Sequence, residues 1–144
     1  MPSPCYSLWS NNTYICGAKP VHYRCDPNKD WHPDLDDIRS KITDKTKALL
    51  IINPNNPTGA VYSRETLEEM IQIAREHKLV LLSDEIYDRL VMDDLQFDSV
   101  AALAPDLPCV TFNGLSKSHI ICGFRCGWMV FSGSTVPRRS RYGC

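Results

Sequence analysis

Residues 48–59, with the sequence ALLIINPNNPTG, decide the fold of this 144-residue chain. The first five residues are continuously apolar, a pattern that indicates a parallel strand covered on both faces. The Asn-Pro and Thr-Gly pairs that follow are typical of a turn, so the strand is expected to end at Asn53. In an open α/β sheet, ligands bind beyond the carboxyl ends of the strands. A binding site is therefore expected in residues 53–59.

Helix and strand patterns alternate on both sides of this segment. Downstream, Ser63 is a suitable N-cap for an amphipathic helix that ends near His77. Upstream, Asp34 opens a second helix with apolar residues on one face. Short apolar runs predict further strands at residues 21–25, 79–82, 109–112 and 128–131. The alternation predicts an α/β fold: part of a mostly parallel open sheet flanked by helices.

The composition excludes several classes of protein. With 43% apolar and 23% charged residues the chain is an ordinary globular sequence, and its formal charge of -1 gives no field that attracts nucleic acid. No apolar run is long enough to cross a membrane and no secretion signal is present, so a cytoplasmic protein without a membrane partner is expected. The seven cysteines and four histidines are scattered, which supports neither a disulfide framework nor a metal site.

Three polar clusters follow three apolar runs: residues 53–59, 83–87 and 113–117. Each cluster alone has an ordinary explanation as a turn, a helix start or a loop. Together, NPNNPTG, SDEIY and the Ser-Lys pair ending at Lys117 resemble the class I and II aminotransferases, within the fold-type I family that depends on pyridoxal 5'-phosphate. Arg125, eight residues after Lys117 in GFRCGW, extends the resemblance, which covers about residues 4–133. The chain is most similar to the bacterial alanine aminotransferase-like branch.

The resemblance implies a catalytic group of Lys117, Asp84 and Tyr87. The Lys117 amine is expected to form a Schiff base with the cofactor aldehyde and to move a proton during the reaction, a role closed to arginine because a guanidinium stays protonated. Asp84 is expected to face the pyridine nitrogen and keep it protonated. Tyr87 and Asn56 match the pair that hydrogen-bonds the phenolic oxygen of the cofactor.

Further cofactor-binding positions follow from the same resemblance. Arg125 matches the phosphate-binding arginine, and Ser116 is expected to add a hydroxyl. Tyr6 falls where relatives place the aromatic ring that stacks on the cofactor, with an ordinary packed tyrosine as the alternative. Trp9 is expected to serve packing, and Glu85 to be structural.

The function that the resemblance implies is transfer of an amino group from an amino acid to a 2-oxo acid, with alanine and 2-oxoglutarate as the suggested pair. Intact relatives are expected to be homodimers, in which one subunit completes the site of the other. The alternative hypothesis is a truncated, non-catalytic fragment that retains at most weak cofactor binding.

The chain also departs from the family pattern. We expect residues 1–133 to form part of the pyridoxal-phosphate-binding large domain and residues 134–144 to be an unrelated tail, with the N-terminal arm and the small C-terminal domain absent. Gly114 stands where many relatives have a phosphate-binding serine, and His119 where an aromatic residue is common. A weaker grip on the phosphate is therefore expected.

Overall fold

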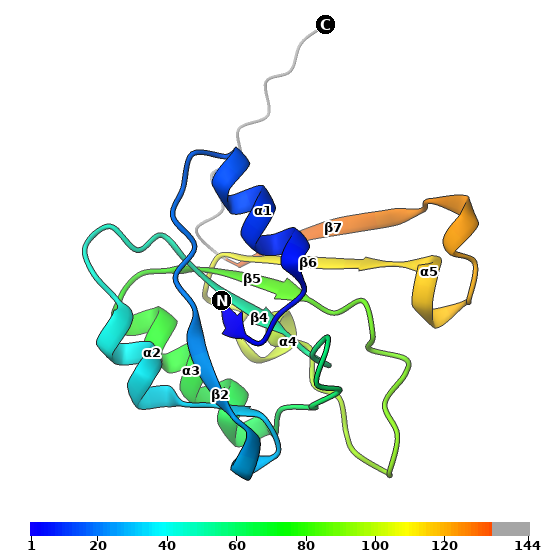
Figure 1. Cartoon of the computed structure of the whole chain (residues 1–144), viewed down its shortest axis with the longest axis horizontal. Coiled ribbons are helices and arrows are strands. Elements are labelled where there is room, and N and C mark those ends of the chain that lie inside the picture. The colour runs from blue at the N-terminus through cyan, green and yellow to red at the C-terminus, as the bar shows by residue number, and fades with distance from the viewer. Residues whose placement is uncertain (134–144) are drawn as a thin grey trace, which may run out of the picture.

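A four-stranded sheet forms the centre of the computed structural model, which describes residues 1–133 (Figure 1). Its order is β4 (Ala48–Ile52), β5 (Val80–Asp84), β6 (Cys109–Gly114) and β7 (Gly127–Ser132). The first three strands are parallel and β7 is antiparallel to β6. The predicted mostly parallel open sheet is confirmed. The tail expected at 134–144 lies outside the described residues.

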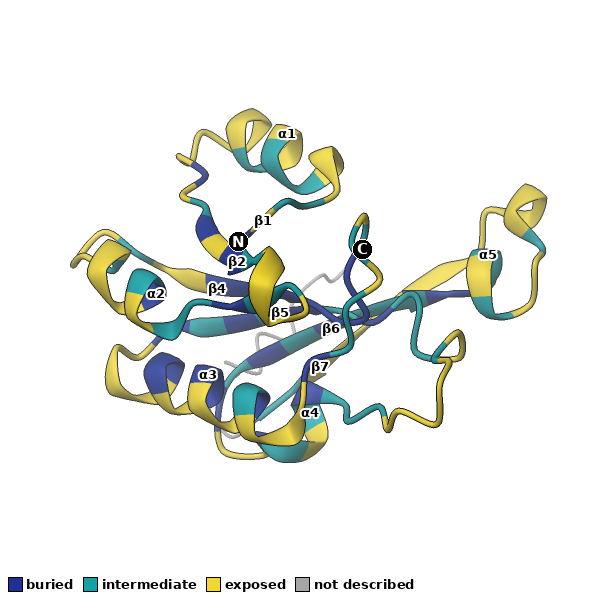
Figure 2. Cartoon of the chain, turned by 60° about the horizontal axis from the view of Figure 1, so that its bottom comes forward, coloured by how far each residue is buried: buried dark blue, intermediate teal, exposed yellow. Residues whose placement is uncertain are grey.

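Helices lie on both sides of this sheet (Figure 2). On one side are α2 (Leu35–Lys41), α3 (Arg64–Glu76) and the short α4 (Val100–Leu103), and on the other is α1 (Ser7–Ile15). Both predicted N-caps are confirmed, because the Asp34 side chain accepts from the Asp37 N–H and that of Ser63 from the Thr66 N–H. A four-residue helix, α5 (Leu115–Ser118), and two single 3-10 turns, η1 (Pro27–Lys29) and η2 (Cys122–Phe124), complete the helical elements of the described residues.

A second, smaller sheet stands beside the first and consists of β1 (Pro2–Ser3), β2 (Tyr23–Asp26) and β3 (His32–Pro33). The strand predicted at 21–25 is therefore present, but it begins two residues later and belongs to this small sheet. It is joined to the main sheet by a buried side chain, since the Tyr23 hydroxyl donates to the Leu50 carbonyl at 3.0 Å.

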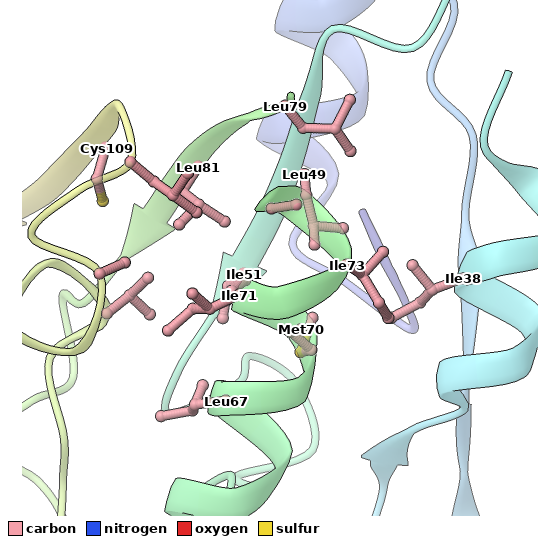
Figure 3. Packing of buried hydrophobic residues seen from close by; sticks show 14 of the residues in the cluster. Ile38, Leu49, Ile51, Leu67, Met70, Ile71, Ile73, Leu79, Leu81 and Cys109 are labelled. Carbon is pink, nitrogen blue, oxygen red and sulfur yellow. The ribbon is translucent and has the colours of Figure 1, made fainter. Parts of the chain in front are cut away.

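The main apolar core lies between α3 and the central strands (Figure 3). Leu49 and Ile51 of β4 belong to this cluster, whereas Leu50 and Ile52 are also fully buried but lie outside it. Successive side chains of a strand point to opposite faces, so both faces of β4 are covered, as its continuous apolar run predicts. The face that α3 contributes consists of Leu67, Met70, Ile71, Ile73 and Ala74.

Strand β7 differs from the other three strands of the main sheet. Four of its consecutive apolar side chains are 45–61% exposed: Trp128, Met129, Val130 and Phe131. Within the described residues, neither face of this edge strand is buried. None of the helices in residues 1–133 is long and apolar enough to span a membrane.

Candidate cofactor site

The three polar clusters meet at one edge of the main sheet. The register pairs Ile52 with Asp84 and Asp84 with Phe112, so β4 and β5 end level with each other and β6 runs two residues further, to Gly114. Backbone bonds continue past the strand ends, from the Asn53 N–H to the Asp84 carbonyl at 3.0 Å and from the Glu85 N–H to the Phe112 carbonyl at 2.9 Å. The expected convergence of the clusters is confirmed.

The loop after β4 divides its three asparagines between two tasks. Asn53 accepts from the Tyr62 N–H through Oδ1 at 2.9 Å, and Asn55 donates through Nδ2 to the Tyr62 hydroxyl at 3.1 Å. Both asparagines are buried and hold the loop against Tyr62. Asn56, in contrast, donates through Nδ2 to the Tyr87 hydroxyl at 3.4 Å, which links the loop to the next cluster.

Asn56 and Tyr87 border a cavity of about 250 Å³. The lining residues come from the loop after β4 and the turn after β5: Pro54, Asn55, Asn56, Pro57, Gly59, Tyr87 and Leu90. The Lys117 Nζ lies 5.7 Å from the centroid of the Tyr87 ring, within the range of a cation–π contact. The structure therefore brings Asn56, Tyr87 and Lys117 into one group.

Asp84 ends β5, three residues before Tyr87, and has two hydrogen-bond donors. Its Oδ2 accepts from the indole Nε1 of Trp9 at 2.7 Å, and its Oδ1 accepts from the Ile86 N–H at 3.3 Å. Burial raises the pKa of the Asp84 carboxyl above its ordinary value, and these two hydrogen bonds act in the opposite direction. Asp84 is thus a half-buried carboxyl, and the hydrogen bonds from Trp9 and Ile86 stabilise its charged form.

Trp9 does more than the packing expected of it. Its ring does pack edge-on against Phe112, with centroids 5.0 Å apart and planes at 78°, but its N–H also bonds Asp84. An indole N–H that is packed away from water usually finds an acceptor. The presence of a tryptophan at position 9 was therefore the only sign in the sequence of a polar role. The partner, 75 positions away, could not be read from local spacing.

Glu85 has the structural role expected of it. Its Oε1 accepts from the Ser83 hydroxyl at 2.9 Å, the Ser99 hydroxyl at 3.1 Å and the Val100 N–H at 3.0 Å. The last bond satisfies a backbone donor at the start of α4. Burial raises the pKa of the Glu85 carboxyl, and its hydrogen bonds oppose that shift.

Replacing Glu85 by alanine is expected to lower the free energy of unfolding by about 2–4 kcal/mol, because two buried donors and one half-buried donor lose their acceptor. Glu85→Gln keeps an acceptor oxygen and is expected to cost less. The pKa of Glu85 is raised in the folded chain, so ionisation of this carboxyl opposes folding. As pH rises through the titration of Glu85, the free energy of unfolding of the native chain is therefore expected to fall relative to that of Glu85→Gln. Urea unfolding at several pH values measures both effects, and a change below about 0.5 kcal/mol for Glu85→Ala would contradict the structural role.

The turn after β5 is also tied to the end of β6, just before α5. Asn113 donates through Nδ2 to Asp88 Oδ2 at 3.0 Å and accepts from the Gly114 N–H through Oδ1 at 2.7 Å. These bonds fix the backbone immediately before the helix that carries Lys117.

Gly114 is explained by the close approach of β6 and β7. A Cβ at this position would lie 2.8 Å from the Cys126 carbonyl oxygen and 3.2 Å from the Gly127 Cα, and both neighbours are backbone. A serine therefore cannot be placed here without moving β7, whatever it might offer a phosphate group.

Gly114→Ser is accordingly expected to destabilise the chain by about 1–3 kcal/mol, the usual cost of overpacking a close backbone contact. Thermal unfolding of the variant measures the loss. Gly123→Ser, at a position where an added Cβ meets nothing within 4 Å, is the matched control. Equal stability of the two variants would contradict the proposed clash.

Like Asp84, three further predicted cofactor residues have no hydrogen bond to this group in the described part of the chain. Tyr6 is 47% exposed and precedes α1, and Ser116 lies next to Lys117 on α5. Arg125 follows η2, in a turn that contacts α5 (Figure 1), and its Nη1 donates to the Cys122 carbonyl at 2.9 Å. The roles of these residues stay predictions.

Residues 1–133 hold no group of three or more His, Cys, Asp or Glu side chains arranged to bind a metal ion. The titratable groups at the sheet edge are instead an amine, a half-buried carboxyl and a phenol, accompanied by a neutral amide.

Comparison with known proteins identifies the class to which this fold and site belong. The sequence profile described as "Aminotransferase class I and II" matches residues 1–137. The chain belongs to the aminotransferase class I and II family.

Within this family, the chain is 56% identical over 133 residues to the glutamate-pyruvate aminotransferase AlaA of Escherichia coli strain K12, and 54% identical to an alanine aminotransferase of Mycobacterium bovis. Each match covers 92% of this chain but only 33% and 31% of the relatives, so the chain spans about a third of their length.

Solved structures agree with the sequence matches. A crystal structure of an Escherichia coli aminotransferase superposes with a TM-score of 0.94 at 53% identity, covering 96% of this chain and 34% of that one. An alanine aminotransferase from Pyrococcus furiosus gives a TM-score of 0.90 at 45% identity, with coverages of 95% and 35%.

Proposed function

We propose that this chain is the pyridoxal 5'-phosphate-binding part of an aminotransferase that transfers an amino group from an amino acid to a 2-oxo acid. The observation that carries the proposal is the group of Asn56, Tyr87 and Lys117 beside the cavity at the edge of the sheet. The names of the relatives point to alanine and 2-oxoglutarate as the exchanging pair. Homodimer assembly of the whole enzyme is proposed on the same family resemblance.

The residues present fit the cofactor in chemical type. Asp84 offers a carboxylate for a protonated pyridine nitrogen, and Asn56 and Tyr87 offer neutral donors for the phenolic oxygen. Lys117 offers a primary amine for the aldehyde. When bound, pyridoxal phosphate supplies an electron sink for the carbanion that forms at the substrate α carbon.

Lys117 has two tasks in this proposal. Its amine would hold the cofactor at the aldehyde, and the same amine, when free, would carry a proton to and from the α carbon of the substrate. The Tyr87 ring, 5.7 Å from Nζ, limits the directions in which the amine can move. Tyr87 therefore orients the base as well as donating its hydroxyl.

Phosphate binding is proposed for Arg125 and Ser116, and stacking for Tyr6. The planar guanidinium of Arg125 presents paired donors that suit phosphate oxygens, and its hydrogen-bond partner among residues 1–133 is the Cys122 carbonyl of its own turn. A phosphate group offers stronger, charge-assisted bonds than that carbonyl, so the side chain would exchange one for the other.

The proposal is tested by adding pyridoxal phosphate to the chain, reducing with borohydride and locating the adduct by mass spectrometry. We expect one adduct, on Lys117. The six other lysines are internal controls: Lys19, Lys29, Lys41, Lys45, Lys47 and Lys78. Label spread over these surface amines in proportion to their exposure would overturn the proposal.

The second candidate function is a fragment without catalytic activity that binds the cofactor weakly or not at all. The exposed apolar side chains of β7 and the coverage of only a third of the relatives favour it. A specific Lys117 adduct without measurable amino transfer between alanine and 2-oxoglutarate would support this candidate for the chain by itself.

A further inference from the structure

The hydrogen bond between Trp9 and Asp84 joins a helix on one face of the main sheet to the carboxyl end of a strand. Trp9 belongs to α1, on the face opposite α3, and its Nε1 donates to Asp84 Oδ2 at 2.7 Å. Its ring is held by Phe112, which is the register partner of Asp84 on β6. The indole is therefore anchored by one strand while its N–H is directed at the carboxyl of the next.

Two donors on different elements set the orientation of the carboxyl. Trp9 holds Oδ2, and the Ile86 N–H holds Oδ1 at the longer distance of 3.3 Å. Fixing both oxygens fixes the plane of the group, whereas the single backbone donor would leave it free to turn about its Cβ–Cγ bond.

We infer that Trp9 is a positioning residue for the cofactor: its indole N–H keeps Asp84 ionised and turned to meet the pyridine nitrogen. The inference rests on the proposed function, because Asp84 is the group through which Trp9 acts. Neither packing nor stacking, the roles available to an aromatic ring, requires the indole nitrogen.

The charge state of Asp84 depends on few groups. The donors to its carboxyl are the neutral Trp9 and Ile86. The charged groups of neighbouring elements are engaged elsewhere: Glu85 with Ser83, Ser99 and Val100, Asp88 with Asn113, and Lys117 with the Tyr87 ring. Loss of the indole donor is therefore not replaced by another cation or donor among the described contacts.

Trp9→Phe tests the inference, since it keeps a smaller aromatic ring beside Phe112 and removes the N–H together with the five-membered ring that carries it. In the cofactor-free chain, carboxyl NMR titration is expected to show the Asp84 pKa rising by about one unit, because a hydrogen bond to the charged form is lost. Trp128→Phe, at a tryptophan 45% exposed on β7, is the matched control and is expected to leave this pKa unchanged.

Binding of two cofactors separates positioning from packing. At a pH below the Asp84 pKa of the native chain, a pKa raised by one unit lowers the ionised fraction tenfold, so we expect Trp9→Phe to weaken pyridoxal phosphate about tenfold there. The affinity for the analogue with carbon in place of the ring nitrogen is expected to stay unchanged. Equal weakening of both compounds, or an unchanged Asp84 pKa, would show that Trp9 only packs and would overturn the inference.

The test also separates this inference from the proposed function. If the native chain prefers pyridoxal phosphate over the carbon analogue and Asp84→Asn removes that preference, the proposed role of Asp84 stands, and Trp9→Phe decides the inference alone. If Asp84→Asn has no effect on binding, the proposed role of Asp84 fails, and the positioning role of Trp9 is overturned with it even if the pKa shift is observed.

Discussion

Replacement of Lys117 by alanine is expected to abolish covalent attachment of pyridoxal phosphate to this chain. Alanine offers no nucleophile, and among the described residues the lining of the cavity beside Asn56 and Tyr87 supplies no lysine in its place. The effect is a total loss rather than a weakening, because a Schiff base needs a primary amine at the site. Visible absorption after cofactor addition and mass mapping after borohydride reduction measure it.

Two further variants make the result for Lys117 specific. Lys117→Arg keeps the positive charge near the Tyr87 ring but remains protonated, so it is expected to fail as completely as alanine. Lys45→Ala, at an exposed lysine after α2, removes an amine of ordinary reactivity and is expected to leave the adduct intact. An adduct that persists in Lys117→Ala would assign the attachment to another residue.

The fold was predictable where a pattern in the sequence has one physical meaning. The continuous apolar run of β4 and the amphipathic pattern of α3 both describe burial, and both elements appear where they were expected. Helix α1 was not anticipated, because it buries no residue completely and leaves Leu8, Tyr14 and Ile15 exposed. Without a buried face, a short helix has no periodic signal to detect.

The candidate site was predictable in residue type more than in contacts. The three asparagines of NPNNPTG are chemically alike, and only the folded loop shows that Asn53 and Asn55 hold Tyr62 while Asn56 bonds Tyr87. The path of the backbone determines which asparagine holds the loop and which one contacts the site. No local spacing in the sequence predicts that path.

Long-range contacts were beyond prediction for a related reason. Trp9 reaches Asp84 only because α1 lies across the sheet face, and Gly114 is required only because the backbone at Cys126, just before β7, passes within 3 Å of where its Cβ would be. Both contacts depend on the placement of whole elements, which single-residue patterns do not determine.

Replacing Asp84 by asparagine is expected to lower the affinity for pyridoxal phosphate about a thousandfold. A carboxylate paired with a pyridinium at about 4 Å contributes roughly 4 kcal/mol at an effective dielectric constant near 20, which corresponds to about three powers of ten. Asparagine keeps the size of the side chain and an oxygen that can accept from the Trp9 indole, so the loss comes from the charge. Equilibrium titration with the cofactor near neutral pH measures it.

The pH dependence of the same cofactor titration independently checks whether loss of the Asp84 charge lowers the affinity. Burial raises the pKa of Asp84, so its carboxylate is lost at a higher pH than that of an exposed aspartate, and affinity is expected to fall as pH drops through that raised pKa. Asp84→Asn has no such group and should lose this acid limb. Asp93→Asn, in an exposed turn with positive φ that suits asparagine, should keep the native profile. The phosphate of the cofactor also titrates in this region, so the profiles of the native chain and Asp84→Asn are compared directly. Identical acid limbs in the two would mean that Asp84 does not hold the ring nitrogen.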